Sequence, residues 1–288
     1  MSVDHFVLTR FNLPTGGVEA RIRAGNAWLT HRWELFERYS VPSMLGQTQH
    51  DHTWVVYFDP ESPAWLFEAV AGYAERGVFV PIYRDEVTTE ALVSDLEAIT
   101  GTRSTMLLTT NLDNDDALAN DALARLRSAV DSTERHALFM VNGLIKGPSG
   151  VYARRDPDNA FCSVAEPWER ARTCWDEWHL MLGRSMPVVR LSGAPGWLQV
   201  VHGENVSNRV RGRLVDPRRE STPFPGLLDD VPSPGVGRRW ADRVVLGPLR
   251  WVRDTVRATG RRVLLTLVGK DGLHRVRGWM AVVVRRSA

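Results

Sequence analysis

The sequence predicts an α/β fold in which a mixed, mostly parallel sheet is flanked by helices and followed by a C-terminal helical extension. Three observations lead to this prediction. Short apolar runs alternate with helical periods up to about residue 135, which is typical of parallel strands joined by helices. The 288 residues are 43% hydrophobic, which is enough for a substantial core. An acidic cluster directly follows one apolar run, as expected at the carboxyl edge of such a sheet.

Four apolar runs in the first part of the chain predict strands, at residues 5–9, 53–58, 77–83 and 105–110. Apolar residues at helical spacing lie between and after these runs, and the dipeptide Ser62-Pro63 predicts a helix N-cap followed by proline at the first helical position. The helical sets are Leu29, Trp33 and Phe36; Trp65, Leu66, Ala69, Val70 and Tyr73; Leu92, Leu96 and Ile99; and Ala119, Leu123, Leu126 and Val130.

After residue 135 the pattern changes. Residues 137–141, 151–153 and 197–201 predict strands whose turn-rich links allow antiparallel pairing. Between them an amphipathic helix is predicted from residue 168 to 182, because Trp168, Ala171, Trp175, Trp178 and Leu182 share one helical face. Residues 216–237 hold five prolines and three glycines, which indicates an irregular linker.

The formal net charge of +2 hides an uneven distribution. Residues 238–288 carry 13 basic and 3 acidic groups, whereas residues 1–237 carry 23 basic and 31 acidic groups. We expect the basic segment to pack on the acidic part of the chain, with its arginine stems covering apolar surface. Peripheral contact with an anionic membrane is the second interpretation. No nucleic-acid partner is expected, because no module of basic and aromatic residues is recognisable.

The compartment is predicted from three absences in the sequence. Cys162 and Cys174 do not form a disulfide framework or a zinc-type pair. The first residues lack a signal-peptide pattern, and no apolar run approaches the ~18 residues of a transmembrane helix. These features predict a cytoplasmic protein, with membrane association at the inner face as the alternative.

Ligands of open α/β sheets bind beyond the carboxyl ends of the strands. Arg10, Asp59 and Arg84 follow the first three predicted strands and are candidate ligand contacts. The fourth strand is followed by three aspartates within four residues: Asp113, Asp115 and Asp116. Clustered carboxylates repel one another unless a cation lies among them, and hard oxygen ligands favour Mg²⁺ or Mn²⁺. The alternative is a solvated turn in which an aspartate caps the next helix.

The stretch LDNDDAL at residues 112–118 resembles the LDNDDAL motif of a rhamnosyltransferase family within the GT-A type of nucleotide-sugar glycosyltransferases. Similar segments are TRFNL at 9–13, the stretch 28–48, FCSVAEP at 161–167 and WLQVVHGENVSN at 197–208. The family usually has arginine before LDNDD, where this chain has Asn111. The resemblance implies a GT-A domain at residues 1–225, and leaves residues 226–288 as a linker plus basic extension.

The resemblance also implies roles for individual residues. Asp115 would be the direct metal ligand, Asp113 would reach the ribose or a metal-bound water, and His202 would be a third protein contact to metal or diphosphate. Asp59 would bind the nucleobase, and the remaining expected donor contacts are Arg10, Arg84, Asn114, Asn205 and Asn208. For His202 the alternative is a strand-end histidine with a structural hydrogen bond. For Asp59 the alternative is an Asp-Pro turn, and for Asn205 and Asn208 a role in loop shape.

An inverting transferase also needs a carboxylate that accepts the proton of the acceptor hydroxyl. The candidates are Glu166, Asp176 and Glu177, and we favour Glu166 because it precedes the predicted helix. Its alternative role is an ordinary acid stabilised by the helix dipole. His179 would contact acceptor or metal, or would lie at the edge of the core.

Together these features predict a metal-dependent glycosyltransferase. It would move a sugar, a deoxyhexose such as rhamnose by the family name, from a UDP-, dTDP- or GDP-linked donor to a carbohydrate, lipid-linked or small-molecule acceptor. A nucleotidyltransferase or phosphoesterase is the first alternative, with Gly16-Gly17 as the only candidate phosphate loop. A non-catalytic carbohydrate-binding protein is the second, supported by the 11 tryptophans.

Overall fold

The computed structural model describes residues 2–14, 26–202 and 210–250. The chain forms two compact units, one of residues 1–210 and 215–234, the other of residues 211–214 and 235–288. Four features lie outside the described residues: the Gly16-Gly17 pair, Asn205, Asn208, and the tail after residue 250. No helix of the described part is long and apolar enough to cross a membrane.

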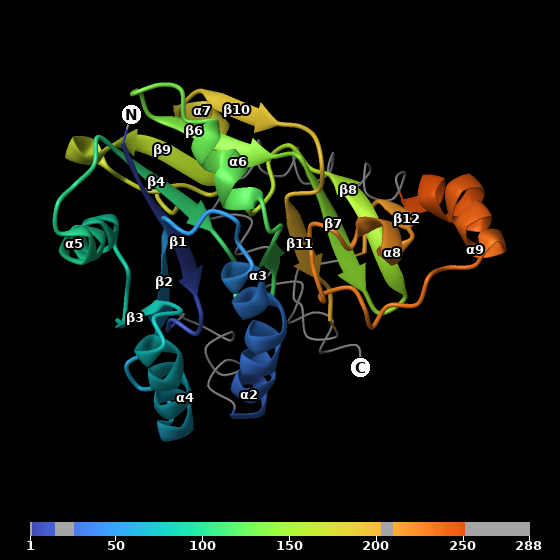
Figure 1. Cartoon of the computed structure of the whole chain (residues 1–288), viewed down its shortest axis with the longest axis horizontal. Helices are drawn as coiled ribbons and strands as arrows, with labels where there is room; N and C mark the ends of the chain where they lie inside the picture. Colours follow the sequence, from blue (N-terminus) through green and yellow to red (C-terminus); the bar gives the residue numbers. More distant parts are fainter. Residues whose placement is uncertain (1, 15–25, 203–209, 251–288) are drawn as a thin grey trace, which may run out of the picture. The chain divides into compact units, whose positions relative to one another are not determined.

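The larger unit is built on a seven-stranded sheet in the order β10-β6-β9-β4-β1-β2-β3 (Figure 1). Strand β1 lies parallel to β2 and β4, β2 is parallel to β3, and β6 is parallel to β10. Only β9 runs antiparallel to its neighbours within this sheet. The predicted mixed, mostly parallel sheet is therefore confirmed. Its strands are β1 (Val3–Arg10), β2 (Thr53–Phe58), β3 (Val80–Tyr83), β4 (Met106–Asn111), β6 (His136–Met140), β9 (Ser163–Pro167) and β10 (Val188–Leu191).

Helices cover both faces of this sheet. The first three predicted helical sets form helices, whereas Ala119 and Val130 of the fourth lie outside its helix α6. A π-helical turn, η1, continues α2 directly into α3. These elements are α2 (Asn26–Leu35), η1 (Phe36–Ser40), α3 (Val41–Leu45), α4 (Ala64–Glu75), α5 (Thr89–Thr100) and α6 (Ala122–Ser128). Ser62 is not the cap of α4, because its hydroxyl donates to the Asp59 carbonyl and Pro63 takes the N-cap position.

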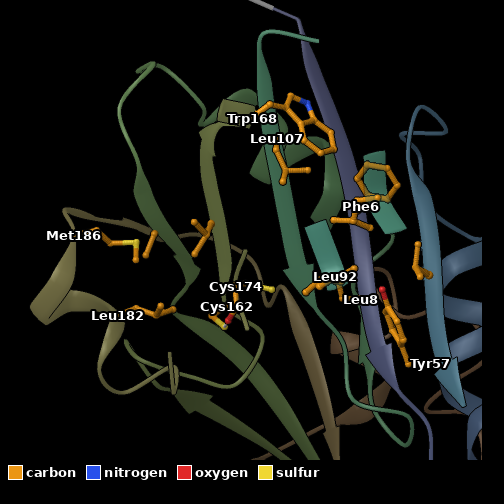
Figure 2. Packing of buried hydrophobic residues seen from close by; sticks show 14 of the residues in the cluster. Phe6, Leu8, Tyr57, Leu92, Leu107, Cys162, Trp168, Cys174, Leu182 and Met186 are labelled. Atoms are coloured by element: carbon orange, nitrogen blue, oxygen red, sulfur yellow. Dashed lines mark hydrogen bonds between the residues drawn. The ribbon is translucent and has the colours of Figure 1, made fainter. Parts of the chain in front are cut away.

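Side chains alternate between the two faces along each strand, as the strand period requires. On one face, Phe6 and Leu8 of β1 and Tyr57 of β2 join Leu92 and Leu96 of α5 in one apolar cluster (Figure 2). On the other face, Phe36 of η1 packs against Trp54 and Phe79 with ring centroids 5.1 and 5.8 Å apart. The sheet is thus buried on both sides, which is why its strands are continuous apolar runs.

A second sheet holds the neighbours β8-β7-β11-β5 in that order. Strands β7 (Asn142–Gly147) and β8 (Gly150–Arg155) form a hairpin, and β11 (Trp197–Val200) lies parallel to β7. On its other side β11 pairs antiparallel with β5 (Ala117–Leu118), which directly follows the aspartate cluster. This short ladder brings the end of β11 beside the aspartates.

The helix predicted over residues 168–182 is wrong. The structure has only a 3₁₀ turn, η2 (Trp168–Arg170), and a short helix α7 (Leu182–Ser185) at the two ends of this segment. Side chains capture the amides that a helix would use: Glu166 accepts from the amides of Arg172 and Thr173, and Thr109 accepts from that of Cys174. Thr173 also has a φ of +66°, which a right-handed helix excludes.

Part of the predicted linker packs on the larger unit. Phe224 is fully buried and Leu228 is 2% exposed, while Lys146 of β7 donates to the Leu227 carbonyl and pairs with Asp230. A short helix, α8 (Pro217–Glu220), is capped by Asp216. The proline-rich composition therefore predicts the irregular path but not its burial.

Within the smaller unit, α9 (Val236–Ala241) and the π-helical turn η3 (Asp242–Leu246) make the described start of the extension helical. The Asp242 carboxylate accepts from the Leu214 amide of β12 (Arg213–Val215) and pairs with Arg250 at 2.5 Å. Val236 and Trp240 are 75% and 65% exposed. The division at residue 225 and the role of the basic tail stay predictions.

Candidate functional site

The aspartate cluster forms a tight turn at the carboxyl end of β4. The Asp116 amide donates to the Asp113 carbonyl, and the Ser40 hydroxyl donates to the Asp116 carbonyl at 2.8 Å. Ser40 lies in η1, so the helical segment after β1 clamps the turn from outside. The three carboxylates of this turn consequently lie in different surroundings.

Asp115 lies at the centre of the candidate site and is only 4% exposed. Its Oδ2 atom lies 2.5 Å from Nη1 of Arg32 and 3.1 Å from Nε2 of His202. Burial opposes ionisation of this carboxyl, but the contacts with His202 and Arg32 outweigh burial and lower its pKa. Asp115 is therefore held as a carboxylate.

Asp113 differs from Asp115 in being exposed. Its carboxylate accepts a hydrogen bond from the Asn111 side chain at 3.2 Å. Asn111 in turn accepts from the indole of Trp175 at 2.7 Å, and the Arg10 guanidinium lies 4.0 Å from the centre of that indole ring. Arg10, Asn111, Asp113 and Trp175 thus form one polar and aromatic edge beside Asp115.

Asn114 and Asp116 have structural partners. The Asn114 amide donates to the Phe11 carbonyl and its oxygen accepts from Arg32. Asp116 is fully buried and accepts from the Val200 amide at 2.8 Å. Burial, with the charges of Asp115 and Asp113 nearby, raises the pKa of Asp116 well above its ordinary value. Asp116 joins the β4 turn to β11 through Oδ1, while its buried Oδ2 has no hydrogen-bond partner in the described part of the chain.

Asp59 and Arg84 lie at the ends of β2 and β3. The Asp59 carboxylate accepts from the Glu61 amide at 2.7 Å, which is the Asp-Pro turn considered as its alternative role. Arg84 forms a two-point ion pair with Asp95 of α5, and the Tyr57 hydroxyl donates to the same carboxylate. The Tyr57 ring lies 5.6 Å from that of Trp175, so this pair borders the same edge.

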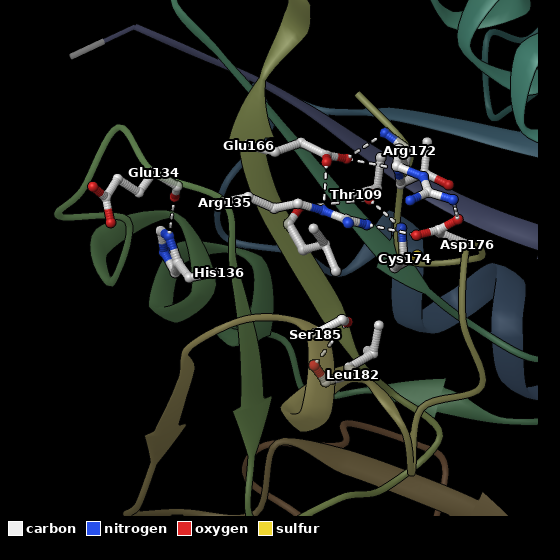
Figure 3. A network of polar contacts seen from close by, with 12 residues as sticks. Thr109, Glu134, Arg135, His136, Glu166, Arg172, Cys174, Asp176, Leu182 and Ser185 are labelled. Atoms are coloured by element: carbon white, nitrogen blue, oxygen red, sulfur yellow. Dashed lines mark hydrogen bonds and ion pairs between the residues drawn. The ribbon is translucent and has the colours of Figure 1, made fainter. Parts of the chain in front are cut away.

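Glu166 lies elsewhere. It pairs in register with Leu107, six residues before Asp113, and is 1% exposed (Figure 3). Its carboxylate accepts from two backbone amides and lies 2.8 Å from Nε of Arg135. Burial raises the pKa of Glu166, although the amides and Arg135 favour its charged form. This geometry makes Glu166 a support for the following segment.

Asp176 belongs to the same network, because it pairs with Arg135 at 3.0 Å and Arg172 at 2.9 Å. The network holds the segment that carries Trp175 toward Asn111. Glu177 and His179 follow on this segment and are half-buried, and the His179 ring contacts Trp178. Glu177, a candidate base, and His179, a candidate contact to acceptor or metal, thus follow Trp175, whose indole donates to Asn111 beside Asp113.

The sequence analysis missed Arg32 and Trp175 as site residues. Arg32 lies within the resembling stretch 28–48 but outside any strand end, so strand-end reasoning could not select it. Trp175 was assigned to a buried helical stripe. In the part of the chain that the structure describes, no group of three or more histidine, cysteine, aspartate or glutamate residues has the geometry of a metal site.

An α/β fold whose ionisable residues gather at the carboxyl edge of the sheet defines an enzyme-like ligand site. The family model described as "Putative rhamnosyl transferase" matches residues 4–214. The chain therefore belongs to this family, whose description is that of a sugar transferase. No curated protein matches the chain significantly.

Several solved structures have low similarity to the chain. Residues 1–349 of S. aureus TarS, in complex with UDP, are 12% identical over 69% of this chain and 60% of that chain, with a TM-score of 0.40. GalNAc-T7 with UDP, GalNAc and Mn²⁺ is 13% identical over 72% and 45%, with a TM-score of 0.42. The inositol-1-phosphate CTP transferase from T. maritima is 12% identical over 78% and 97%, with a TM-score of 0.35. The matched region spans 37% of full TarS.

Proposed function

We propose that this protein transfers a sugar from a nucleoside diphosphate donor with the help of a divalent ion at the aspartate turn. One observation is central to the proposal. Asp115, at the end of β4, and His202, just beyond β11, lie 3.1 Å apart while Asp113 is exposed on the same turn. Two carboxylates and an imidazole from separate segments thus gather at the edge where ligands of α/β sheets bind.

These residues fit a divalent ion that binds together with its substrate. A magnesium ion is usually held by one or two carboxylates and by substrate phosphates, not by a complete protein cage. Within the described residues no three histidine, cysteine, aspartate or glutamate side chains form such a cage. Asp113 and Asp115 would hold the ion, with His202 on the ion or on the diphosphate. When bound, the ion neutralises charge on the leaving phosphate.

The donor would lie along the edge formed by Arg10, Asn111 and Trp175. Arg10 supplies a cation and the indole supplies an apolar surface, which suit a phosphate and a nucleoside respectively. Arg84 borders this edge through its pair with Asp95, and Asp59 and Arg84 are proposed to contact the nucleobase side of the donor. Asn205 and Asn208 are proposed donor contacts outside the described residues. The donor nucleotide is proposed to be UDP, dTDP or GDP, and rhamnose is proposed as the sugar from the family name.

The base is proposed to lie on the segment that follows Trp175. Glu166 and Asp176 carry arginine pairs within a buried network, which supports a positioning role for both. Glu177 and His179 are then the candidates that accept the proton of the acceptor hydroxyl. The acceptor is proposed to be a carbohydrate, a lipid-linked carbohydrate or a small molecule. Contact of the basic extension with an anionic membrane belongs to the same proposal.

Nucleotide-dependent thermal stability tests this function. UDP, dTDP and GDP are added to the full chain with and without Mn²⁺, and the unfolding temperature is measured. At least one nucleotide should stabilise the protein, more strongly with Mn²⁺, and Asp115→Asn should remove that gain. The conservative control Asp121→Asn changes an exposed helix pair with Arg125 and should retain it. A gain that survives Asp115→Asn, or no gain with any nucleotide, contradicts the proposal.

A further inference from the structure

Arg32 occupies the position where a cation is needed at the aspartate turn. It extends from α2, is 15% exposed in its side chain, and places Nη1 2.5 Å from Oδ2 of Asp115. The same nitrogen lies 3.2 Å from the side-chain oxygen of Asn114. The Arg32 guanidinium therefore neutralises the most buried ionised carboxylate of the proposed metal site.

The Arg32 pair uses only part of the guanidinium. Arginine and carboxylate often form two parallel hydrogen bonds, as Arg84 and Asp95 do in this protein. At Asp115 the ion pair is made by Nη1, and the buried Nε of Arg32 has no acceptor in the described part of the chain. A buried hydrogen-bond donor without an acceptor costs free energy, and a second anionic partner of the guanidinium would remove that cost.

The Asp115 oxygen that contacts Arg32 is also the oxygen that contacts His202. A divalent ion at this oxygen would stand within a few ångströms of a fixed positive charge, and like charges at that distance repel strongly in a partly buried site. The ion and the guanidinium therefore cannot both hold Asp115 as closely as the guanidinium does in this structure.

We propose that Arg32 is a tethered counter-cation which competes with the divalent ion for Asp115 and binds the donor diphosphate once it is released. The inference rests on the proposed function, because it presumes that a divalent ion uses Asp115. It predicts that the free protein binds the ion weakly and that diphosphate and ion bind in a mutually supportive way. Arg32 would then couple the two events without being a ligand of the ion.

Direct Mn²⁺ binding tests the competition without an activity assay. Electron paramagnetic resonance of free Mn²⁺ is followed during titration into the full chain, first without any phosphate ligand. Arg32→Gln should bind Mn²⁺ about tenfold more tightly than the wild type, because a positive charge next to the ligand is removed. Arg32→Lys keeps the charge and should stay close to the wild type, which also controls for folding.

Arg38→Gln is the matched control, since it removes the same charge from the neighbouring helical turn, where Arg38 pairs with Asp230 and is 57% exposed. It should leave Mn²⁺ affinity unchanged. With inorganic pyrophosphate as the probe and Mn²⁺ at saturation, Arg32→Gln should bind pyrophosphate about tenfold more weakly than Arg38→Gln does.

The outcomes separate the inference from the proposed function. If Asp115→Asn abolishes Mn²⁺ binding but Arg32→Gln binds Mn²⁺ no more tightly than the wild type, the competition is refuted and the metal site stands. Pyrophosphate binding that is unaffected by Arg32→Gln refutes the second role of Arg32. If no variant binds Mn²⁺ even with pyrophosphate present, the metal-dependent function itself is wrong and the inference falls with it.

Discussion

Two clusters of arginine and acidic residues in this protein use the same side-chain types for different purposes. At the end of β4, Asp115 meets Arg32 and His202 beside an exposed Asp113. On β9, Glu166 meets Arg135, and Asp176 pairs with Arg135 and Arg172. Both clusters bury ionised groups that need partners to be tolerated.

The difference between the clusters lies in what satisfies the carboxylate. Glu166 accepts two backbone amides, so its bonds fix the path of residues 172–174. Asp115 contacts the side chains of Arg32 and His202, and the exposed Asp113 lies on the same turn. A carboxylate that accepts hydrogen bonds from backbone amides fixes the backbone path. A carboxylate that contacts side chains at a sheet edge can exchange these partners for a ligand.

Among the substitutions that test this difference between the clusters, replacement of Asp115 should have the largest effect. Asp115→Asn is expected to lower kcat/KM by about 10³-fold, roughly 4 kcal/mol of transition-state stabilisation, because the charge that holds the divalent ion is lost. Initial rates over a donor series measure the effect, once an acceptor is known. Asp121→Asn is the control. Activity within tenfold of the wild type would mean that the β4 cluster is structural like the β9 cluster.

Glu166→Gln should affect stability before chemistry. The change removes the charge of Glu166 from a buried pair and leaves Arg135 with Asp176 as its remaining acidic partner, and we expect a loss of about 3 kcal/mol in the free energy of unfolding. Urea denaturation measures it. Glu97→Gln, which breaks the more exposed pair with Arg103, should cost less than about 1 kcal/mol. A Glu166→Gln protein of normal stability but no activity would restore Glu166 as the base.

His5 adds a third kind of buried titratable group, one without a counter-charge. Its Nε2 lies 2.9 Å from the Thr110 hydroxyl, and burial, aided by the neighbouring His52 and Arg127, lowers its pKa to about 3. Between pH 6.5 and about 3, His5 is protonated in the unfolded chain but stays neutral in the folded chain. Stability should fall with pH there, by up to about 1.4 kcal/mol per unit from this group.

The matched measurement compares the wild type with His5→Gln in urea denaturation at pH 7, 6, 5 and 4. The variant is expected to be less stable at pH 7 and to show a shallower decline, by about one proton. Parallel curves for the two proteins would show that His5 is not the group that carries the acid dependence.

Arg84 should give the smallest effect. Its pair with Asp95 is partly exposed, so Arg84→Gln is expected to lower stability by less than about 1 kcal/mol. If Arg84 borders the donor, the variant should raise KM for the donor a few-fold at constant kcat. Arg103→Gln is the control, and an equal KM in both variants would remove Arg84 from the donor site.

Much of the secondary structure of the first 130 residues was predictable, because the strands of a sheet that is buried on both faces are continuous apolar runs in the sequence. The run at 53–58 coincides with β2, and the cluster after the fourth run lies at the carboxyl edge as expected. The segment 168–182 was not predictable from periodicity. Its amides are captured by Glu166 and Thr109, which are near it only after β9 has paired with β4.

The candidate site was predictable only where local sequence defines it. Asp113 and Asp115 follow a strand and carry a motif, whereas Arg32 reaches Asp115 across 83 positions of chain through packing of α2. Trp175 reaches Asn111 only because the predicted helix is absent. Contacts made by the far end of a long side chain leave no spacing signal in one sequence.

The pairing of β5 with β11 determines where the residues after β11 lie relative to the aspartate turn. Trp197 pairs with Leu118 and Leu198 with Ala117, and the Val200 amide still reaches Asp116 beyond the last pair. His202, two residues further along, places Nε2 3.1 Å from Oδ2 of Asp115. Lengthening β11 by one residue would move the imidazole by about 3.3 Å and turn it to the opposite face. In this family the number of residues between the tryptophan of β11 and the histidine should therefore vary less than the residues themselves.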